Sequence, residues 1–144
     1  MKKHILIVCA FLGIVMAASV AGAGDFDGTR PLLISVIRVV ECTPDAACRE
    51  VTPASVDLPQ FLKIDFANKT IGPAAADDET PATAIERQEV VDGKLMLQGA
   101  EDGYANLKDG LGWTLTISEE TGRVVLTASG DQVAFVVFGA SLPL

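Results

Sequence analysis

Carboxylates are the most abundant groups in this chain that could perform acid–base chemistry. The sequence has 19 Asp and Glu residues, three cysteines and a single histidine. Two facing carboxylates suffice to hydrolyse a glycosidic bond when an apolar environment raises the pKa of one of them. Most acids here fall in expected turns or at polar positions of expected strands, so no pair stands out. A hydrolase with paired carboxylates remains an alternative, and we predict no specific catalytic residue.

The histidine lies in a segment that is typical of a cleaved signal peptide. Two lysines precede an apolar run over residues 5–20, and small residues follow as far as Ala23. This order indicates an export signal covering residues 1–23, with cleavage between Ala23 and Gly24. The alternative is an uncleaved anchor, because the apolar run and its small residues are nearly long enough to span a bilayer. After cleavage, no imidazole remains for catalysis and no further membrane span is expected.

The mature part, residues 24–144, is expected to form one domain. Removing 23 of the 144 residues leaves 121, which is enough for one hydrophobic core and too few for two ordinary domains. Loss of the two N-terminal lysines changes the formal net charge from −8 to −10. Such a charge disfavours nucleic acid, because binding phosphates needs clustered Lys and Arg. We expect an exported bacterial protein, periplasmic or secreted, and a monomer.

Cys42 and Cys48 are predicted to form a disulfide. Cys9 lies in the export signal, so these two are the only cysteines of the mature chain, and an oxidising compartment favours their pairing. The bond closes a short loop, for which the chain-entropy contribution is about 2 kcal/mol, so we expect a local clamp. A redox-active pair usually sits closer together at a helix start. A soft metal site needs more ligands than two cysteines, and we predict neither a metal nor a cofactor.

Turn signals and period-2 alternation predict strands. Apolar and polar residues alternate at 62–66, 94–98 and 113–118, as expected for strands with one buried face. Thr52 and Pro53 predict a single helical turn. Turn dipeptides recur at strand-length intervals in the C-terminal half and predict an antiparallel meander: Asp92-Gly93, Asp102-Gly103, Asp109-Gly110, Thr121-Gly122 and Gly130-Asp131.

Two segments, 32–37 and 133–138, are apolar on both faces. Short continuous apolar runs suit central strands, so we expect these two to be the most buried. Their pairing would close the sheet and remove its exposed edges. The prediction is an all-β fold, a small antiparallel meander closing into a barrel or sandwich of about eight strands. A flexible loop is expected near residues 72–83, which have two prolines and no apolar period.

Four shorter features have both a structural and a functional interpretation. The acidic run 77–79 is a solvated loop or a calcium ligand set, and residues 25–28 are a mobile N-terminus or a fragment of a calcium loop. Asn68 begins a glycosylation sequon but also suits a hairpin turn. Trp113 and Tyr104 are the amphipathic aromatics, and for Trp113 we favour core packing over a binding role.

Several short blocks, in this order, resemble a group of small exported proteobacterial β-rich proteins of unknown function. In that group, additional cysteines occupy the positions of Ile34 and Ser141. If those two bond each other, the strands at the two ends of the domain lie side by side. The resemblance implies no activity. The blocks are Phe26-Asp27-Gly28, Pro31-Leu32-Leu33, Glu41-Cys42, Cys48, Leu58-Pro59-Gln60-Phe61-Leu62, Asp65-Phe66 and Phe135-Val136-Val137-Phe138-Gly139-Ala140.

The predicted function is that of a non-enzymatic exported envelope protein that binds a protein partner or a small apolar ligand. An open mouth lined by apolar side chains would favour the ligand. A filled core with an exposed apolar patch would favour the protein partner. The alternating pattern is the same in both cases, so the sequence does not choose between them.

Overall fold

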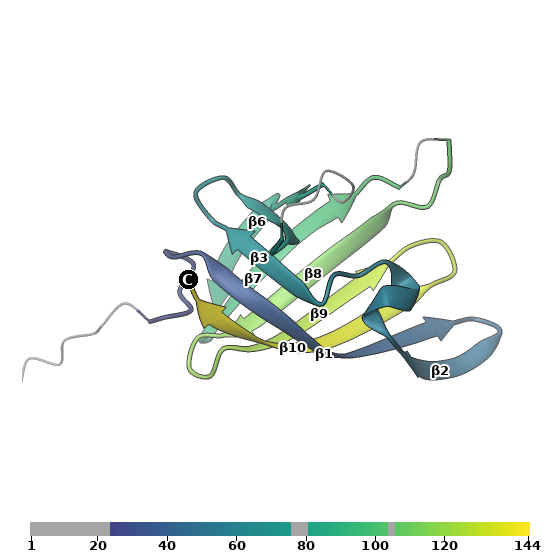
Figure 1. The fold of residues 1–144 in the computed structure, drawn as a ribbon, viewed down its shortest axis with the longest axis horizontal. Coiled ribbons are helices and arrows are strands. Elements are labelled where there is room, and N and C mark those ends of the chain that lie inside the picture. Colours follow the sequence, from purple (N-terminus) through teal and green to yellow (C-terminus); the bar gives the residue numbers. More distant parts are fainter. Residues whose placement is uncertain (1–23, 76–80, 104–105) are drawn as a thin grey trace, which may run out of the picture.

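The computed structural model describes residues 24–75, 81–103 and 106–144, which form an antiparallel all-β structure (Figure 1). The predicted fold class is confirmed, with ten strands where about eight were expected. The predicted export signal 1–23, the acidic run 77–79 and Tyr104 lie outside the described residues. The elements are β1 (Leu32–Thr43), β2 (Ala46–Val51), the 3₁₀ turn η1 (Pro53–Val56), β3 (Phe61–Asp65), β4 (Thr70–Pro73), β5 (Thr83–Ala84), β6 (Arg87–Val91), β7 (Lys94–Glu101), β8 (Leu111–Ser118), β9 (Arg123–Ser129) and β10 (Ala134–Pro143).

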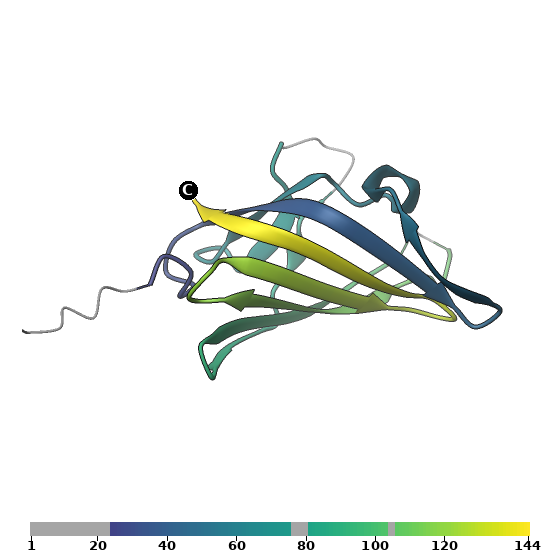
Figure 2. The same cartoon turned by 90° about the horizontal axis from the view of Figure 1, so that it is seen from below.

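The strands form one sheet that curls into a half-barrel (Figures 1 and 2). Their order is β5-β4-β3-β1-β10-β9-β8-β7-β6, and β2 pairs with β1 outside this path. The two end strands, β5 and β6, are consecutive in the chain. β5 pairs with β4, and β6 pairs with β7. The Thr83 hydroxyl also donates to the Ala100 carbonyl at 2.9 Å, and the Glu86 amide donates to the Gln98 carbonyl at 2.9 Å. The chain between β4 and β7 therefore contacts both ends of the strand order.

The long strands β1 and β10 lie side by side, as predicted for the two apolar segments (Figure 2). Their pairing extends from Leu32 opposite Pro143 to Cys42 opposite Ala134. The expected role of this pairing was wrong, because it lies in the middle of the sheet rather than at its closure. The reason is that β3, β4 and β5 continue the sheet beyond β1.

The core lies on the concave side of the half-barrel. Alternation in β3, β7 and β8 places one side chain in two on this side, as predicted, and Leu95, Leu97 and Leu115 are 0% exposed. Trp113 belongs to the same cluster at 7% exposure, so its assignment to the core is confirmed. A second, smaller cluster of Val36, Val39 and Val137 lies near η1 and β2, packed against partly buried residues that include Val51 and Val56. With about 25 cal/mol for each Å² of apolar surface removed from water, these two clusters are the main source of stability.

The predicted turns are confirmed only in part. Asp92 and Gly93, both with positive φ (49° and 70°), join β6 to β7 in a two-residue hairpin, and residues 121–122 lie between β8 and β9. In contrast, the Asp-Gly pairs at 102–103 and 109–110 both belong to the single connection between β7 and β8. They therefore mark the two ends of one long loop and not two hairpins.

The N-terminal turn at 25–28 is more ordered than expected, because Phe26 packs against the core and lies close to Gly122. Of the loop predicted near 72–83, the two ends lie in sheet, since β4 extends to Pro73 and β5 starts at Thr83, and residues 76–80 lie outside the described residues. The predicted helical turn is confirmed as η1, with Thr52 at its N-cap.

Candidate functional site

The convex side of the half-barrel carries large apolar side chains that are not part of the core. Cross-strand partners point to the same face of a sheet, so register shows which side chains lie together. Leu33 is opposite Leu142, and Phe138 lies between Arg38 and Val125. We call the following six residues the outer apolar face: Leu33, Ile37, Phe61, Val125, Phe138 and Leu142.

The side chains of the outer apolar face are highly exposed for large apolar residues. Ile37 is 71% exposed, Leu142 65% and Phe61 50%, and Phe138 and Val125 are exposed to 40% and 39%. The face spans four neighbouring strands, β3, β1, β10 and β9, a width of roughly 14 Å at a strand spacing of about 4.8 Å. Single exposed apolar residues are ordinary, whereas several large ones on one side of a sheet favour an interaction surface.

Ile37 owes its position to a β-bulge in β1. The register shifts between Val36, which is opposite Gly139, and Arg38, which is opposite Phe138. The extra residue lets both Val36 and Val39 point inward, at 3% and 0% exposure. Ile37 is left without a partner and projects outward, which is how bulges re-aim a side chain.

The outer face of the sheet also has a charge balance unlike the rest of the chain. Strand register places five of the nine Lys and Arg residues of 24–144 on this face, against three carboxylates. The remaining acids lie mostly in the turns and loops that join the strands. The cations are Arg38, Lys63, Arg87, Lys94 and Arg123, and the carboxylates are Glu50, Asp65 and Glu89.

Three of these cations form ion pairs. Arg38 pairs with Glu50 at 2.9 Å, Lys94 lies 3.5 Å from Asp92, and Arg87 pairs with its strand neighbour Glu89.

Within the described part of the chain, Lys63 and Arg123 have no carboxylate within 4.0 Å. Lys63 flanks the outer apolar face on β3 and Arg123 flanks it on β9. Asp65 lies two residues from Lys63 on the same side of β3, and its pKa is lowered first by hydrogen bonds from Asn68 and then by the charge of Lys63. The face therefore has two cations at its rim, with one carboxylate beside Lys63.

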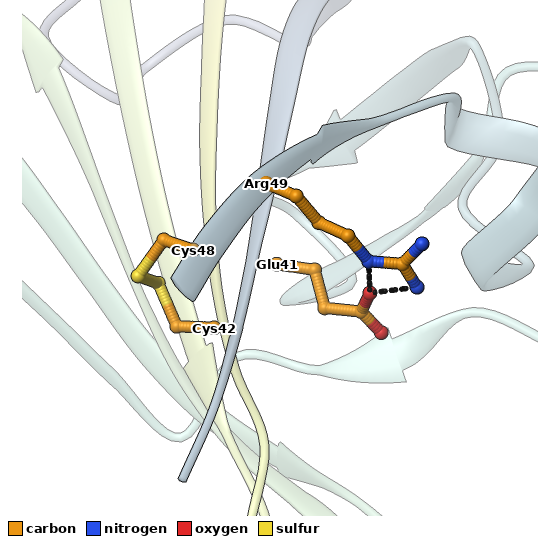
Figure 3. Close-up of a disulfide and its surroundings, with 4 residues drawn as sticks. All are labelled: Glu41, Cys42, Cys48 and Arg49. Atoms are coloured by element: carbon orange, nitrogen blue, oxygen red, sulfur yellow. Dashed lines mark hydrogen bonds and ion pairs between the residues drawn. A yellow bond between two sulfur atoms is a disulfide. The ribbon is translucent and has the colours of Figure 1, made fainter. Parts of the chain in front are cut away.

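The disulfide between Cys42 and Cys48 is present and holds the hairpin of β1 and β2 together, as predicted (Figure 3). The Glu41 carboxylate accepts from two guanidinium nitrogens of Arg49, at 2.7 and 2.9 Å, beside the bond. β2 is exposed along almost its whole length and makes its strand pairing with β1 alone. The bond thus clamps a strand that has little packing of its own.

A hollow of about 440 Å³ lies across β7, β8, β9 and β10. The lining residues form rows of cross-strand partners, and register puts two of these rows on the outer side of the sheet. The hollow is therefore a shallow groove on that side. Trp113, which also lines it, points inward. Glu86 is the one carboxylate that lines it. The outer rows are Gln98, Thr114, Thr127 and Val136, and Gly112, Ser129 and Ala134.

The described carboxylates do not form the pair that a hydrolase of this type needs. None of them is buried, since the one buried polar side chain among the described residues is Ser141. The pKa of Asp65 is held below its ordinary value by hydrogen bonds from Asn68, and the pKa of Asp27 by hydrogen bonds from Thr29. These shifts are opposite to the one that prepares a general acid.

The other candidate residues have structural roles. Asn68 lies in the turn between β3 and β4 and donates its side-chain amide to Asp65 at 3.0 Å. The indole N–H of Trp113 is buried and has no hydrogen-bond partner among the described residues. Over residues 24–75, 81–103 and 106–144, no three His, Cys, Asp or Glu side chains are grouped to hold a metal ion. In the same residues we find no helix with the length and apolarity to cross a membrane.

The positions of Ile34 and Ser141 are direct partners in the pairing of β1 with β10. Both side chains are buried, and the Ser141 hydroxyl donates to the Gly122 carbonyl at 2.9 Å. The adjacency that the resemblance implied for these positions is thus present in the fold.

No protein family, curated protein or solved structure matches this sequence. The outer apolar face was missed in the sequence, although its signal was visible. The segments 32–37 and 133–138 are apolar on both faces, and this pattern was taken to indicate burial on both sides.

Proposed function

We propose that this chain is a non-enzymatic, exported envelope protein that binds another protein through its outer apolar face. The observation that carries the proposal is the exposure of Ile37, Phe61 and Leu142 at 50 to 71% on one side of a sheet whose other side is packed. When a partner covers apolar surface of this kind, its removal from water makes the free energy of association more favourable. The disulfide supports export, because such bonds persist in oxidising compartments.

A protein partner is favoured over a small apolar ligand by the state of the interior. A carrier needs an enclosed apolar cavity. Here the concave side is filled by side chains that include Leu32, Ile64 and Ile117, each 0% exposed. The hollow across β7 to β10 is a shallow groove on the convex side with threonine and serine side chains along it.

The hydrolase alternative has no comparable support. Its mechanism needs two carboxylates across a cleft, one of them in an apolar environment. The groove has Glu86 alone, and that residue is exposed. We therefore argue for binding.

Site-specific photo-crosslinking in the exporting bacterium tests the proposal. A photoreactive phenylalanine analogue replaces Leu142 on the outer apolar face, and in a matched strain it replaces Val90, which is 50% exposed but lies off that face. We expect position 142 to give a discrete adduct with one other protein, which then binds the purified chain. Equal adducts at both positions, or none, would refute a docking role for the face. A reproducible added mass in native mass spectrometry of the purified protein would instead favour the small ligand.

A further inference from the structure

We propose that the protein partner offers an apolar pocket for Ile37 and carboxylates for Lys63 and Arg123. This inference rests on the proposed function and adds the chemistry of the partner. It joins two independent observations, the bulge that projects Ile37 and the two rim cations, Lys63 and Arg123, that have no carboxylate within 4.0 Å among the described residues.

Ile37 is suited to act as the anchor of the interface. It projects from β1 between Phe61 on β3 and Phe138 on β10, near the centre of the outer apolar face. With 71% of its surface exposed, it is the most exposed large apolar side chain among the described residues. Binding energy in interfaces concentrates in a few central side chains that enter pockets, while the surrounding contacts exclude water.

The rim determines the charge of the partner. Lys63 and Arg123 lie on β3 and β9, separated by three strand spacings, about 14 Å in the direction across the strands, and offset by two residues along them. Along the strand direction, both cations lie on the same side of Ile37, toward Leu33 and Leu142. Each can pair with a carboxylate of the partner at little desolvation cost, because rim positions stay partly hydrated. Charges placed in this way select partners and speed association more than they add affinity.

An anionic membrane is a weaker candidate for the occupant. Attraction to acidic lipids usually takes a cluster of four to eight Lys or Arg residues. This face has two that are unpaired among the described residues, on a mature chain with a formal charge of −10. The acids at the strand ends would approach the lipid headgroups together with the face.

A second copy of the chain is also disfavoured. A symmetric dimer would bring the same face of two copies together, each with a formal charge of −10 over residues 24–144. The like charge of the two copies would oppose this association. The complementary surface is therefore on a different protein with acidic groups beside an apolar pocket.

The test uses the photo-crosslinker at position 142 in four backgrounds of the full-length protein. I37D places a charge on the anchor, and K63E/R123E reverses the rim. V90D is the control for I37D, since Val90 is similarly placed on a strand but off the face. K69E/K108E is the control for the rim, because it makes the same change in net charge at turn and loop positions. Urea unfolding of each variant shows whether the fold is retained.

We expect I37D and K63E/R123E each to lower the adduct yield at least ten-fold, with both controls within two-fold of the parent. The affinity of the purified chain for its purified partner should also fall in I37D and K63E/R123E and stay near the parent value in the two controls. The salt dependence of this affinity should weaken in K63E/R123E. An adduct with the parent that persists in I37D and K63E/R123E would overturn the inference but leave the proposed function standing. Adducts with lipid or with a second copy would overturn the inference in favour of those occupants. The absence of any adduct in the parent would overturn both.

Discussion

Replacing Ile37 and Val39 by alanine provides a direct test of the bulge in β1. The two residues are two positions apart on one strand, yet Ile37 is 71% exposed and Val39 is 0% exposed. Regular alternation would place them on the same face. The bulge between Val36 and Arg38 places them on opposite faces. Substitution by alanine should therefore lower the free energy of unfolding by different amounts at the two positions.

The expected magnitudes follow from burial. V39A removes two carbons from a fully buried site, worth about 1.6 kcal/mol at about 0.8 kcal/mol each, and the cavity term brings the loss to about 2 kcal/mol. I37A removes three carbons that are shielded to 29%, given 71% exposure, which corresponds to about 0.7 kcal/mol.

Urea unfolding followed by the fluorescence of Trp113 measures both losses, because this is the only tryptophan in the chain and it lies in the core. With an m-value of about 1.5 kcal/mol/M, the midpoint should fall by about 1.3 M in V39A and about 0.5 M in I37A. Equal shifts in the two variants would mean that Ile37 is packed in the core. In that case the outer apolar face loses its central residue, and the argument for a docking surface fails with it.

Three further predictions concern stability. C42S/C48S should unfold with about 2 kcal/mol less stability than the parent in a thermal or urea experiment, since the native bond closes a loop of sequence separation 6; no change would show that the clamp is dispensable. I34C/S141C should form a second disulfide, seen as a further loss of two hydrogens in intact mass. A bond that closes a loop of about 100 residues contributes about 4.7 kcal/mol, and the packing lost with Ile34 reduces the net gain in the free energy of unfolding to about 2 kcal/mol. The pKa of Asp65 is lowered by hydrogen bonds from Asn68, so its contribution is present above the unfolded pKa of about 3.9 and is lost as pH falls through the lower folded value; D65N should flatten the acid side of the stability profile, and an unchanged profile would contradict this.

Local sequence signals predicted those parts of the fold that depend on one strand and its turn. Alternation located the inward residues of β3, β7 and β8, and the pair Asp92-Gly93 located a hairpin that needs positive φ at both positions. These features are decided within a few residues, by side-chain period and by backbone sterics. The disulfide was predictable for a similar reason, because the sequence outside the predicted export signal offers two cysteines and one pairing.

The elements that the sequence did not reveal are stabilised by distant partners. β2 has no apolar face of its own, and it exists as a strand because β1 pairs with it and the disulfide holds it there. β5 has two residues and depends on pairing with β4. The middle position of the β1–β10 pair likewise depends on β3 continuing the sheet past β1. A pattern within one segment has no information about which neighbours the rest of the chain will supply.

The outer apolar face shows a different limit, and it also explains how an exposed face of this kind is tolerated. A strand that is apolar on both sides has the same sequence whether its second side meets the core or a partner. What distinguishes the two cases here is the charge around the strand. Acids gather at the turns, and the cations Lys63 and Arg123 stand beside the apolar centre. Residues 24–144 carry a formal charge of −10, and repulsion between like-charged copies opposes self-association through this face. An apolar strand with cations among acidic turns therefore predicts a heterologous partner, whereas the same strand among uncharged neighbours would predict burial.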